Sequence, residues 1–291
     1  MHPGKKKWVF LAVLSLIWGS SFILIKKGLI GLTPLQLGAL RIIVSGVFIF
    51  IFGFYTLKDI TRKQWKWLII SGFLGTFFPA FLFAFAETEI DSAVASILNS
   101  LTPLNTILIG FSIFKIVSST RQIIGVAIGF IGTALLILKG ADLNPDQNYL
   151  YAGFVVLATI MYGTNVNIIK KHLQEVKAIT IAIGNFAAIM IPAAIVLFST
   201  DFIDRASFQN KDFMMSVMYV VILSAFGTAL AKVLFNKLIQ MSTPVFASSV
   251  TYAMPVVALL WGVLDGEGFS VLQGLATLLI LFGIYLANKR N

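Results

Sequence analysis

The sequence contains no cysteine among its 291 residues, and its two histidines are His2 and His172. These shortages exclude disulfide bonds, thiolate metal sites and cysteine nucleophiles, and they leave almost no ligands for a zinc or haem centre. We therefore expect no metal and no other cofactor. Charged residues are also scarce, at 12% of the chain, whereas a soluble domain carries about 25%. So little charge cannot cover a water-facing surface, and the outside of this protein must face lipid.

Apolar residues make up 58% of the chain, and its mean hydropathy is +0.92. They form runs close to the roughly 20 residues that a helix needs to cross a bilayer. The ten predicted spans are residues 8–25, 34–54, 67–86, 92–114, 120–138, 149–169, 178–198, 214–236, 245–264 and 270–288. The first run lacks the small-x-small cleavage pattern of a signal peptide, and we take it as a retained span. The prediction is an all-α, polytopic membrane protein without a soluble domain.

The net charge of +10 does not indicate nucleic-acid binding, because the basic residues form short clusters between apolar runs. With the N-terminus in the cytoplasm, fifteen Lys and Arg residues fall on the cytoplasmic side and five on the other. Such an excess is typical of cytoplasmic loops. We expect a multi-pass protein of the bacterial inner (plasma) membrane with both termini cytoplasmic. Its expected partners are the lipid bilayer and a small-molecule substrate, with no nucleic acid, and both a monomer and a homodimer remain open.

The second half of the chain repeats the first. At an offset of 144, Trp18-Gly19-Ser20-Ser21 aligns with Tyr162-Gly163-Thr164-Asn165, and at an offset of 152, Gly75-Thr76 aligns with Gly227-Thr228. Each copy holds five spans, and because five is odd, the second copy crosses the membrane upside down. We predict two inverted five-helix repeats, residues 1–140 and 141–291, around a central cavity. Secondary transporters have this architecture; the alternative is a duplicated scaffold without transport.

A set of short motifs follows the same order along nearly the whole chain. They are Trp18-Gly19-Ser20-Ser21-Phe22, Leu40-Arg41-Ile42, the mid-span Pro103 and Pro255, Leu264-Asp265-Gly266-Glu267, Gln273 and Gly283. Together they resemble the EamA-type family of the drug/metabolite transporter superfamily. The resemblance implies ten helices in two inverted repeats, a central cavity and movement of small metabolites, often outward. The chain departs from the family at Lys115, where an acid is usual, and at Tyr162, where Trp is usual.

Two cations lie inside the predicted spans, where a charge is costly unless it is paired or faces water. Arg41 lies seven residues after Pro34, about 10 Å into its span at 1.5 Å per residue. Its planar guanidinium suits a carboxylate or phosphate; alternatively, it extends to the outer surface or pairs with backbone carbonyls. Lys232 is a second candidate substrate-binding residue; it lies nearer the cytoplasmic end of its span, which slightly favours the alternative that it extends to the cytoplasmic surface.

The fourth and ninth spans offer a second set of candidates. Asn99 and Pro103 are four residues apart, as are Thr251 and Pro255, so each pair shares a helix face. A mid-span proline frees a carbonyl that a neighbour, water or substrate must satisfy. We expect these residues, with Tyr252, to line the cavity. Close helix packing through small residues is the alternative.

The first and sixth spans offer a third set. Trp18 and Ser21 are three residues apart, as are Tyr162 and Asn165, so each pair projects from one helix face. An aromatic ring beside a hydroxyl or amide can hold an apolar group and fix a polar one. The adjacent Gly19 and Gly163 would allow close backbone approach or a local bend.

The predicted spans contain no carboxylate well inside the membrane. Glu87, Glu89 and Asp91 form the densest acidic group, and they fit a solvated external loop. Cation exporters commonly place a carboxylate in the membrane, so this chain favours solutes that carry a carboxylate. The sequence contains no P-loop, which argues against direct ATP drive.

The leading hypothesis is a secondary transporter, not an enzyme, that moves small organic metabolites such as amino acids or related carboxylates, outward, by alternating access. A passive channel for small solutes and a membrane-embedded lipid-modifying enzyme are the alternatives.

Overall fold

The computed structural model describes residues 3–116, 119–143, 148–204, 209–266 and 270–288, and these residues form helices and connections without a strand. In chain order the helices are α1 (Pro3–Gly28), α2 (Pro34–Gly53), η1 (Phe54–Asp59), α3 (Arg62–Gly72), η2 (Phe73–Phe77), α4 (Phe78–Ala86), α5 (Ser92–Leu98), η3 (Asn99–Leu101), α6 (Thr102–Ser112), α7 (Thr120–Leu143), η4 (Tyr149–Tyr151), α8 (Ala152–His172), α9 (Ala178–Phe198), η5 (Asp201–Ile203), α10 (Lys211–Ile222), η7 (Leu223–Leu230), α11 (Ala231–Met241), α12 (Pro244–Ser248), α13 (Val250–Leu264) and α14 (Val271–Asn288). Each of the ten predicted spans coincides with one helix or with a run of adjoining helices, so the prediction of an all-α polytopic protein is confirmed.

Several spans are built from more than one helical segment. The third span continues through α3, η2 and α4, and the eighth through α10, η7 and α11; both η2 and η7 are π-helical. Eight of the helical runs in the described chain are long and apolar enough to cross a membrane, while α7 and α14 contain shorter apolar stretches, Thr120–Gly132 and Gly274–Gly283. A π-helical turn inside an α-helix often marks a functional site.

The starts of α2 and α3 are fixed by capping boxes. Thr33 Oγ1 accepts a hydrogen bond from Gln36 N at 3.3 Å, and Gln36 Oε1 accepts one from Thr33 N at 3.0 Å. Thr61 and Gln64 form the same pair ahead of α3. Such reciprocal bonds satisfy backbone N–H groups that a helix start leaves open. The helix α3 therefore starts at Arg62, whereas the third span was predicted to start at residue 67. The cap determines the start of the helix, and its charged first turn lies outside the apolar run.

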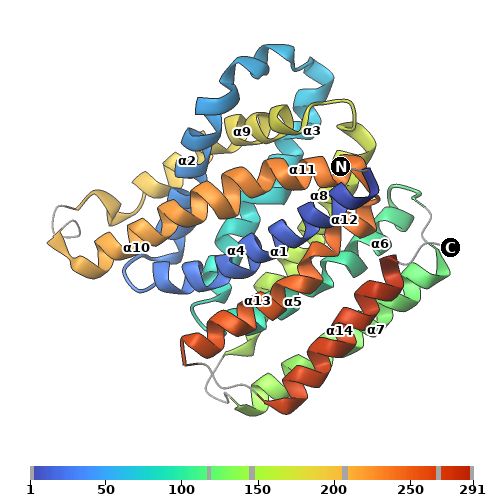
Figure 1. The fold of residues 1–291 in the computed structure, drawn as a ribbon. Helices are drawn as coiled ribbons and strands as arrows, with labels where there is room; N and C mark the ends of the chain where they lie inside the picture. Colours follow the sequence, from blue (N-terminus) through green and yellow to red (C-terminus); the bar gives the residue numbers. More distant parts are fainter. Residues whose placement is uncertain (1–2, 117–118, 144–147, 205–208, 267–269, 289–291) are drawn as a thin grey trace.

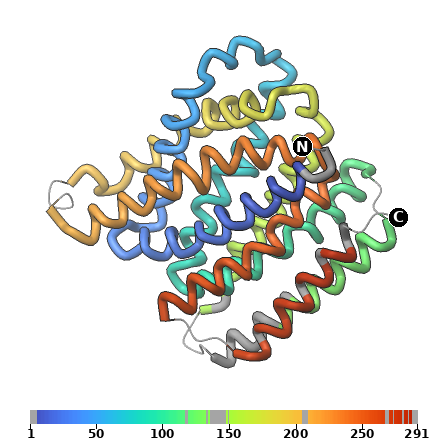
Figure 2. The backbone as a smooth tube through the Cα atoms, in the orientation of Figure 1, coloured from blue at the N-terminus to red at the C-terminus, as the bar shows by residue number. Residues whose placement is uncertain are grey.

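The helices pack mainly across the two halves of the chain. The most extensive contacts join α7 to α14, α2 to α9, α1 to α13 and α6 to α8. Figure 1 shows α7 and α14 side by side along one edge of the bundle. The start of α1 and the end of α14 lie toward the same end of the molecule, as an even number of crossings requires, and the backbone trace in Figure 2 shows the same arrangement.

Two glycines proposed from the sequence, Gly19 and Gly163, allow close helix crossings. A β-carbon at Gly19 would lie 2.9 Å from the Met254 carbonyl oxygen on α13, and one at Gly163 would lie 2.8 Å from the Thr106 backbone nitrogen on α6. Both distances are shorter than real β-carbon contacts allow. The expectation of close backbone approach at these two positions is therefore confirmed.

Candidate substrate-binding cavity

A cavity of about 100 Å³ lies between the two halves of the chain. Eight of the eleven residues proposed from the sequence line it: Trp18, Ser21, Arg41, Asn99, Tyr162, Asn165, Lys232 and Thr251. Its other described lining residues are Phe22, Ile25, Ile42, Gly75, Thr76, Ala80, Phe83, Thr102, Gly227, Thr228, Phe235 and Met254. The lining therefore combines aromatic and aliphatic walls with a few polar groups.

Arg41, in the third turn of α2, points across the cavity and not to the outer surface. Its Nε donates to Thr228 Oγ1 of η7 at 2.8 Å. The side chain is half-buried, and its two Nη groups make no hydrogen bond with any residue that the structure describes. A guanidinium held at Nε with both Nη groups open presents its fork to a ligand.

Lys232, on α11, is buried in the cavity wall. Its Nζ donates to Gly75 O at 3.2 Å and to Thr76 Oγ1 at 3.0 Å, both on η2. Of the two interpretations of Lys232, extension to the cytoplasmic surface is therefore wrong, and a place in the cavity wall fits. The π-helical turn η2 presents a backbone carbonyl and a hydroxyl inside the bundle, and these acceptors hold the ammonium there.

The Gly-Thr pairs of η2 and η7 have matching roles that the sequence prediction missed. Thr76 accepts from Lys232, and Thr228 accepts from Arg41. The Gly227 carbonyl accepts from Trp18 Nε1 at 2.8 Å, as the Gly75 carbonyl accepts from Lys232. The signal was present in the sequence, since polar Gly-Thr pairs stand in mid-span at equivalent positions of the two copies.

The aromatic and amide residues of α1 and α8 are fixed by neighbours from other helices. Trp18 packs edge-on against Phe235, with ring centroids 4.9 Å apart, and Tyr162 stacks at 6.1 Å on Phe83. Asn165 Oδ1 accepts a hydrogen bond from Ser71 Oγ at 2.6 Å. Trp18 and Tyr162 therefore give the cavity an aromatic wall from each half of the chain.

Three residues proposed from the sequence, Pro103, Tyr252 and Pro255, do not line the cavity. Tyr252 is buried beside α7, where a β-carbon at Gly129 would lie 3.3 Å from its ring. The carbonyls that the two prolines free are already satisfied, because Asn99 O accepts from Thr102 Oγ1 at 2.7 Å and Thr251 O accepts from Ser100 Oγ at 3.1 Å. These carbonyls thus bond to neighbouring hydroxyls and not to a solute.

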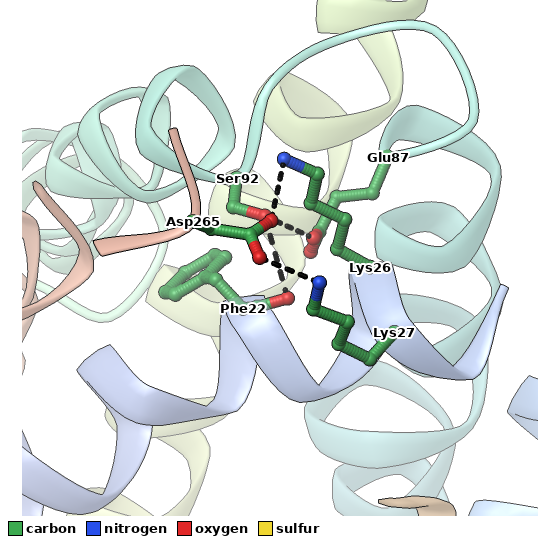
Figure 3. Close-up of polar contacts among 6 residues, drawn as sticks. All are labelled: Phe22, Lys26, Lys27, Glu87, Ser92 and Asp265. Carbon is green, nitrogen blue, oxygen red and sulfur yellow. Dashed lines mark hydrogen bonds and ion pairs between the residues drawn. The ribbon is translucent and has the colours of Figure 1, made fainter. Parts of the chain in front are cut away.

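Ion pairs join the end of α1 to the end of α13 (Figure 3). Lys26 Nζ lies 3.2 Å from Asp265 Oδ2, and Lys27 Nζ lies 2.5 Å from Asp265 Oδ1. The hydrogen bond from Lys27, more than that from Lys26, holds the pKa of Asp265 below its ordinary value, against a smaller opposing effect of burial. Gly266, with a φ of 89°, reverses the chain directly after Asp265. Glu267, the last residue of that motif, lies outside the described residues.

Glu87 lies beside these ion pairs and is buried, with 8% of its surface exposed. Ser92 Oγ shares its single hydrogen between Glu87 Oε2, at 3.2 Å, and the Phe22 carbonyl oxygen of α1, at 3.5 Å (Figure 3). The prediction of a solvated loop is therefore wrong for Glu87, although Glu89 is exposed. The reason is that Glu87 caps the buried end of α4, beneath the start of α5.

The lysine pair that corresponds to Lys26 and Lys27 at the offset of 144 has different partners. Lys170 Nζ donates to the carbonyls of Ser242 at 2.8 Å, Ile239 at 3.3 Å and Gln240 at 3.4 Å. Lys171 Nζ donates to the Phe114 carbonyl at 3.3 Å. The end of α8 is thus held to its neighbours by backbone carbonyls, whereas the end of α1 is held by a carboxylate.

Comparison with known proteins agrees with the fold. The EamA-like transporter family matches residues 6–138 and 150–289 of this chain. The uncharacterized inner membrane transporter YedA of Escherichia coli strain K12 is 26% identical, over 95% of this chain and 88% of its own length. A probable amino-acid metabolite efflux pump of Salmonella typhimurium is also 26% identical, over 95% of this chain and 93% of the pump.

Two further comparisons cover almost all of the chain. An uncharacterized transporter of Archaeoglobus fulgidus is 26% identical over 98% of this chain and 100% of its own length. A protein of known crystal structure is similar in fold, with a TM-score of 0.72 at 16% identity, covering 98% of this chain and 96% of that one. With the family matched along both halves, this multi-pass inner-membrane protein is a transporter and not an enzyme, and it belongs to the EamA-like transporter family.

Proposed function

We propose that this protein is a secondary transporter that exports small organic solutes carrying a carboxylate, such as amino acids or related acids, by alternating access. The observation that carries the proposal is the guanidinium of Arg41, which reaches into the cavity with both Nη groups open. A carboxylate can accept two parallel hydrogen bonds from such a fork. Lys232 adds a second positive charge, and Trp18 and Tyr162 supply apolar surface for the rest of the solute.

Alternating access requires two halves that exchange conformations, and we assign this role to residues 1–140 and 141–291 as inverted repeats. The hydrogen bonds of Arg41 to Thr228 and of Lys232 to Thr76 each cross from one half to the other. Lys115 and Gly266 support the same division, because each follows the fourth span of its half with a positive φ, of 55° and 89°. Inverted repeats that enclose a site between them are typical of secondary transporters.

The name of the Salmonella relative, a probable amino-acid metabolite efflux pump, supports both the outward direction and the solute class. We further propose that both termini are cytoplasmic and that a monomer is sufficient, because one chain encloses the cavity. Single cysteines introduced at Lys63 and Asp201 test the orientation. Impermeant thiol reagents added outside cells should label position 201 and leave position 63 unlabelled, and the reverse pattern would overturn the orientation.

Flux into proteoliposomes tests the transport proposal, with Arg41→Ala as the variant. Saturable uptake of a carboxylate solute should fall at least tenfold, because a charge-assisted bidentate contact is lost. Arg62→Ala is the matched control, since Arg62 is an exposed arginine at the start of α3. Normal uptake by a folded Arg41→Ala protein would remove Arg41 from the site. Counterflow distinguishes a carrier from a passive channel, which would show neither saturation nor exchange.

A further inference from the structure

We infer that the natural solute is an organic anion without a positively charged amino group, for example a 2-oxo or 2-hydroxy acid with an apolar side chain, and not a zwitterionic amino acid. This inference rests on the proposed transport of carboxylates and narrows it. It follows from an imbalance among the polar groups of the cavity: the cationic side chains have open N–H groups, whereas the carbonyl oxygens of Gly75, Gly227 and Asn165 already accept hydrogen bonds.

Three oxygens that line the cavity already accept hydrogen bonds from the protein. The carbonyl oxygens of Gly75 and Gly227 accept from Lys232 and Trp18. The side-chain oxygen of Asn165 is occupied as well, because Oδ1 accepts from Ser71 Oγ at 2.6 Å. An ammonium group has three N–H donors, and it would find these oxygens engaged.

The donors of the same lining show the opposite pattern. Within the part of the chain that the structure describes, the two Nη groups of Arg41 and the Tyr162 hydroxyl donate to no residue. Lys232 Nζ has two acceptors for its three N–H groups. These groups converge on the cavity from α2, α8 and α11. They match a carboxylate, which is an acceptor only when it is ionised.

The charges of the cavity lining also favour an anion over a zwitterion. The described lining residues include Arg41 and Lys232 and no carboxylate. The ammonium of an amino acid is attached to the carbon that carries its carboxylate, so seating the carboxylate on Arg41 brings the ammonium near the guanidinium as well. Like charges repel more strongly in a dry interior than in water. Glu87 is the acid that attracts Arg41, and it lies outside the cavity lining with Ser92 bound to it.

The wild-type protein tests the inference by direct comparison of matched solutes. Leucine and 4-methyl-2-oxopentanoate have the same carbon skeleton and differ at one position, as do phenylalanine and phenylpyruvate. We expect each oxo acid to bind and to be transported with at least tenfold higher affinity than its amino acid, measured in the same proteoliposomes near neutral pH. Equal or tighter binding of the amino acids would overturn the inference and leave carboxylate transport intact. Failure of all four acids to bind would instead overturn the proposed function itself.

Lys232→Met probes the physical reason for the preference. The change removes one positive charge and releases the two acceptors on Gly75 and Thr76. The affinity ratio of oxo acid to amino acid should then fall at least fivefold, whereas it should stay constant in Lys237→Met, an exposed position on the same helix. An unchanged ratio in Lys232→Met would contradict the charge argument. Amino-acid transport that is lost in Glu87→Gln would also contradict it, because Glu87 would then serve as the ammonium site.

Discussion

The substitution Gly163→Ala tests whether the crossing of α8 and α6 depends on the absence of a side chain. The added β-carbon would lie 2.8 Å from Thr106 N and 2.9 Å from the carbonyl carbon of Asn105, whereas ordinary contact begins at 3.4 Å. Both neighbours are backbone atoms, so no rotamer change relieves the overlap and the helices must separate. Overpacking of this kind costs about 1–3 kcal/mol, and alanine regains roughly 1 kcal/mol of helix propensity. Because the clash is with backbone, we expect a net destabilisation of about 1–2 kcal/mol.

The assay is apparent thermal stability of the purified protein, compared with Gly153→Ala on the same helix. A β-carbon at Gly153 would meet no atom within 4 Å, so that variant should be as stable as the wild type or slightly more so. A loss of about 1–2 kcal/mol lowers the melting temperature of a chain of a few hundred residues by several degrees, at roughly 2–4 °C for each kcal/mol. Equal melting temperatures for the two variants would refute the close approach of α8 and α6.

Two further substitutions test the polar contacts. Asp265→Asn should lower the free energy of unfolding by about 0.2–1 kcal/mol, the range for partly exposed ion pairs. Because the pKa of Asp265 is lowered in the folded protein, the contribution of its carboxylate is complete above the ordinary carboxyl pKa and is lost as the pH falls below it. The stabilities of wild type and variant should therefore converge in acid, and a difference that stays constant with pH would contradict this. Thr228→Val removes the acceptor of Arg41 Nε and should raise the KM for a carboxylate solute several-fold with little change in stability, whereas an unaltered KM would show that Thr228 does not position the guanidinium.

The spans could be predicted because each depends on a property that the sequence shows directly. The length of the apolar runs, the flanking charges and the positions of the prolines define the ten spans. Trp18 and Tyr162 occupy corresponding positions of the two halves of the sequence, and both line the same cavity. Comparison of the two halves of the sequence singled out six of the eight lining residues, namely Trp18, Ser21, Asn99, Tyr162, Asn165 and Thr251. The other two, Arg41 and Lys232, were found as charges inside apolar runs.

The surroundings of Lys232 and Glu87 could not be predicted, because both residues depend on tertiary partners. Lys232 lies close enough to a membrane surface to reach it, and the acceptors that keep it inside belong to η2, more than 150 residues away in sequence. Glu87 follows an apolar helix directly and looks like a loop residue, and the start of α5 buries it. The π-helical turns could not be anticipated either, since their extra residue per turn leaves no periodic signature in so short a segment.

The lysine pair at the end of α1 and the pair at the end of α8 have different partners, so dissolved salt affects their contacts differently. Separating Lys26 and Lys27 from Asp265 breaks contacts between full charges, and dissolved ions weaken such contacts where they are exposed. Separating Lys170 and Lys171 from backbone carbonyls breaks contacts between a charge and fixed dipoles, which mobile ions affect far less. Salt around Asp265 should therefore weaken the contacts that hold the end of α1 and leave those that hold the end of α8 nearly unchanged.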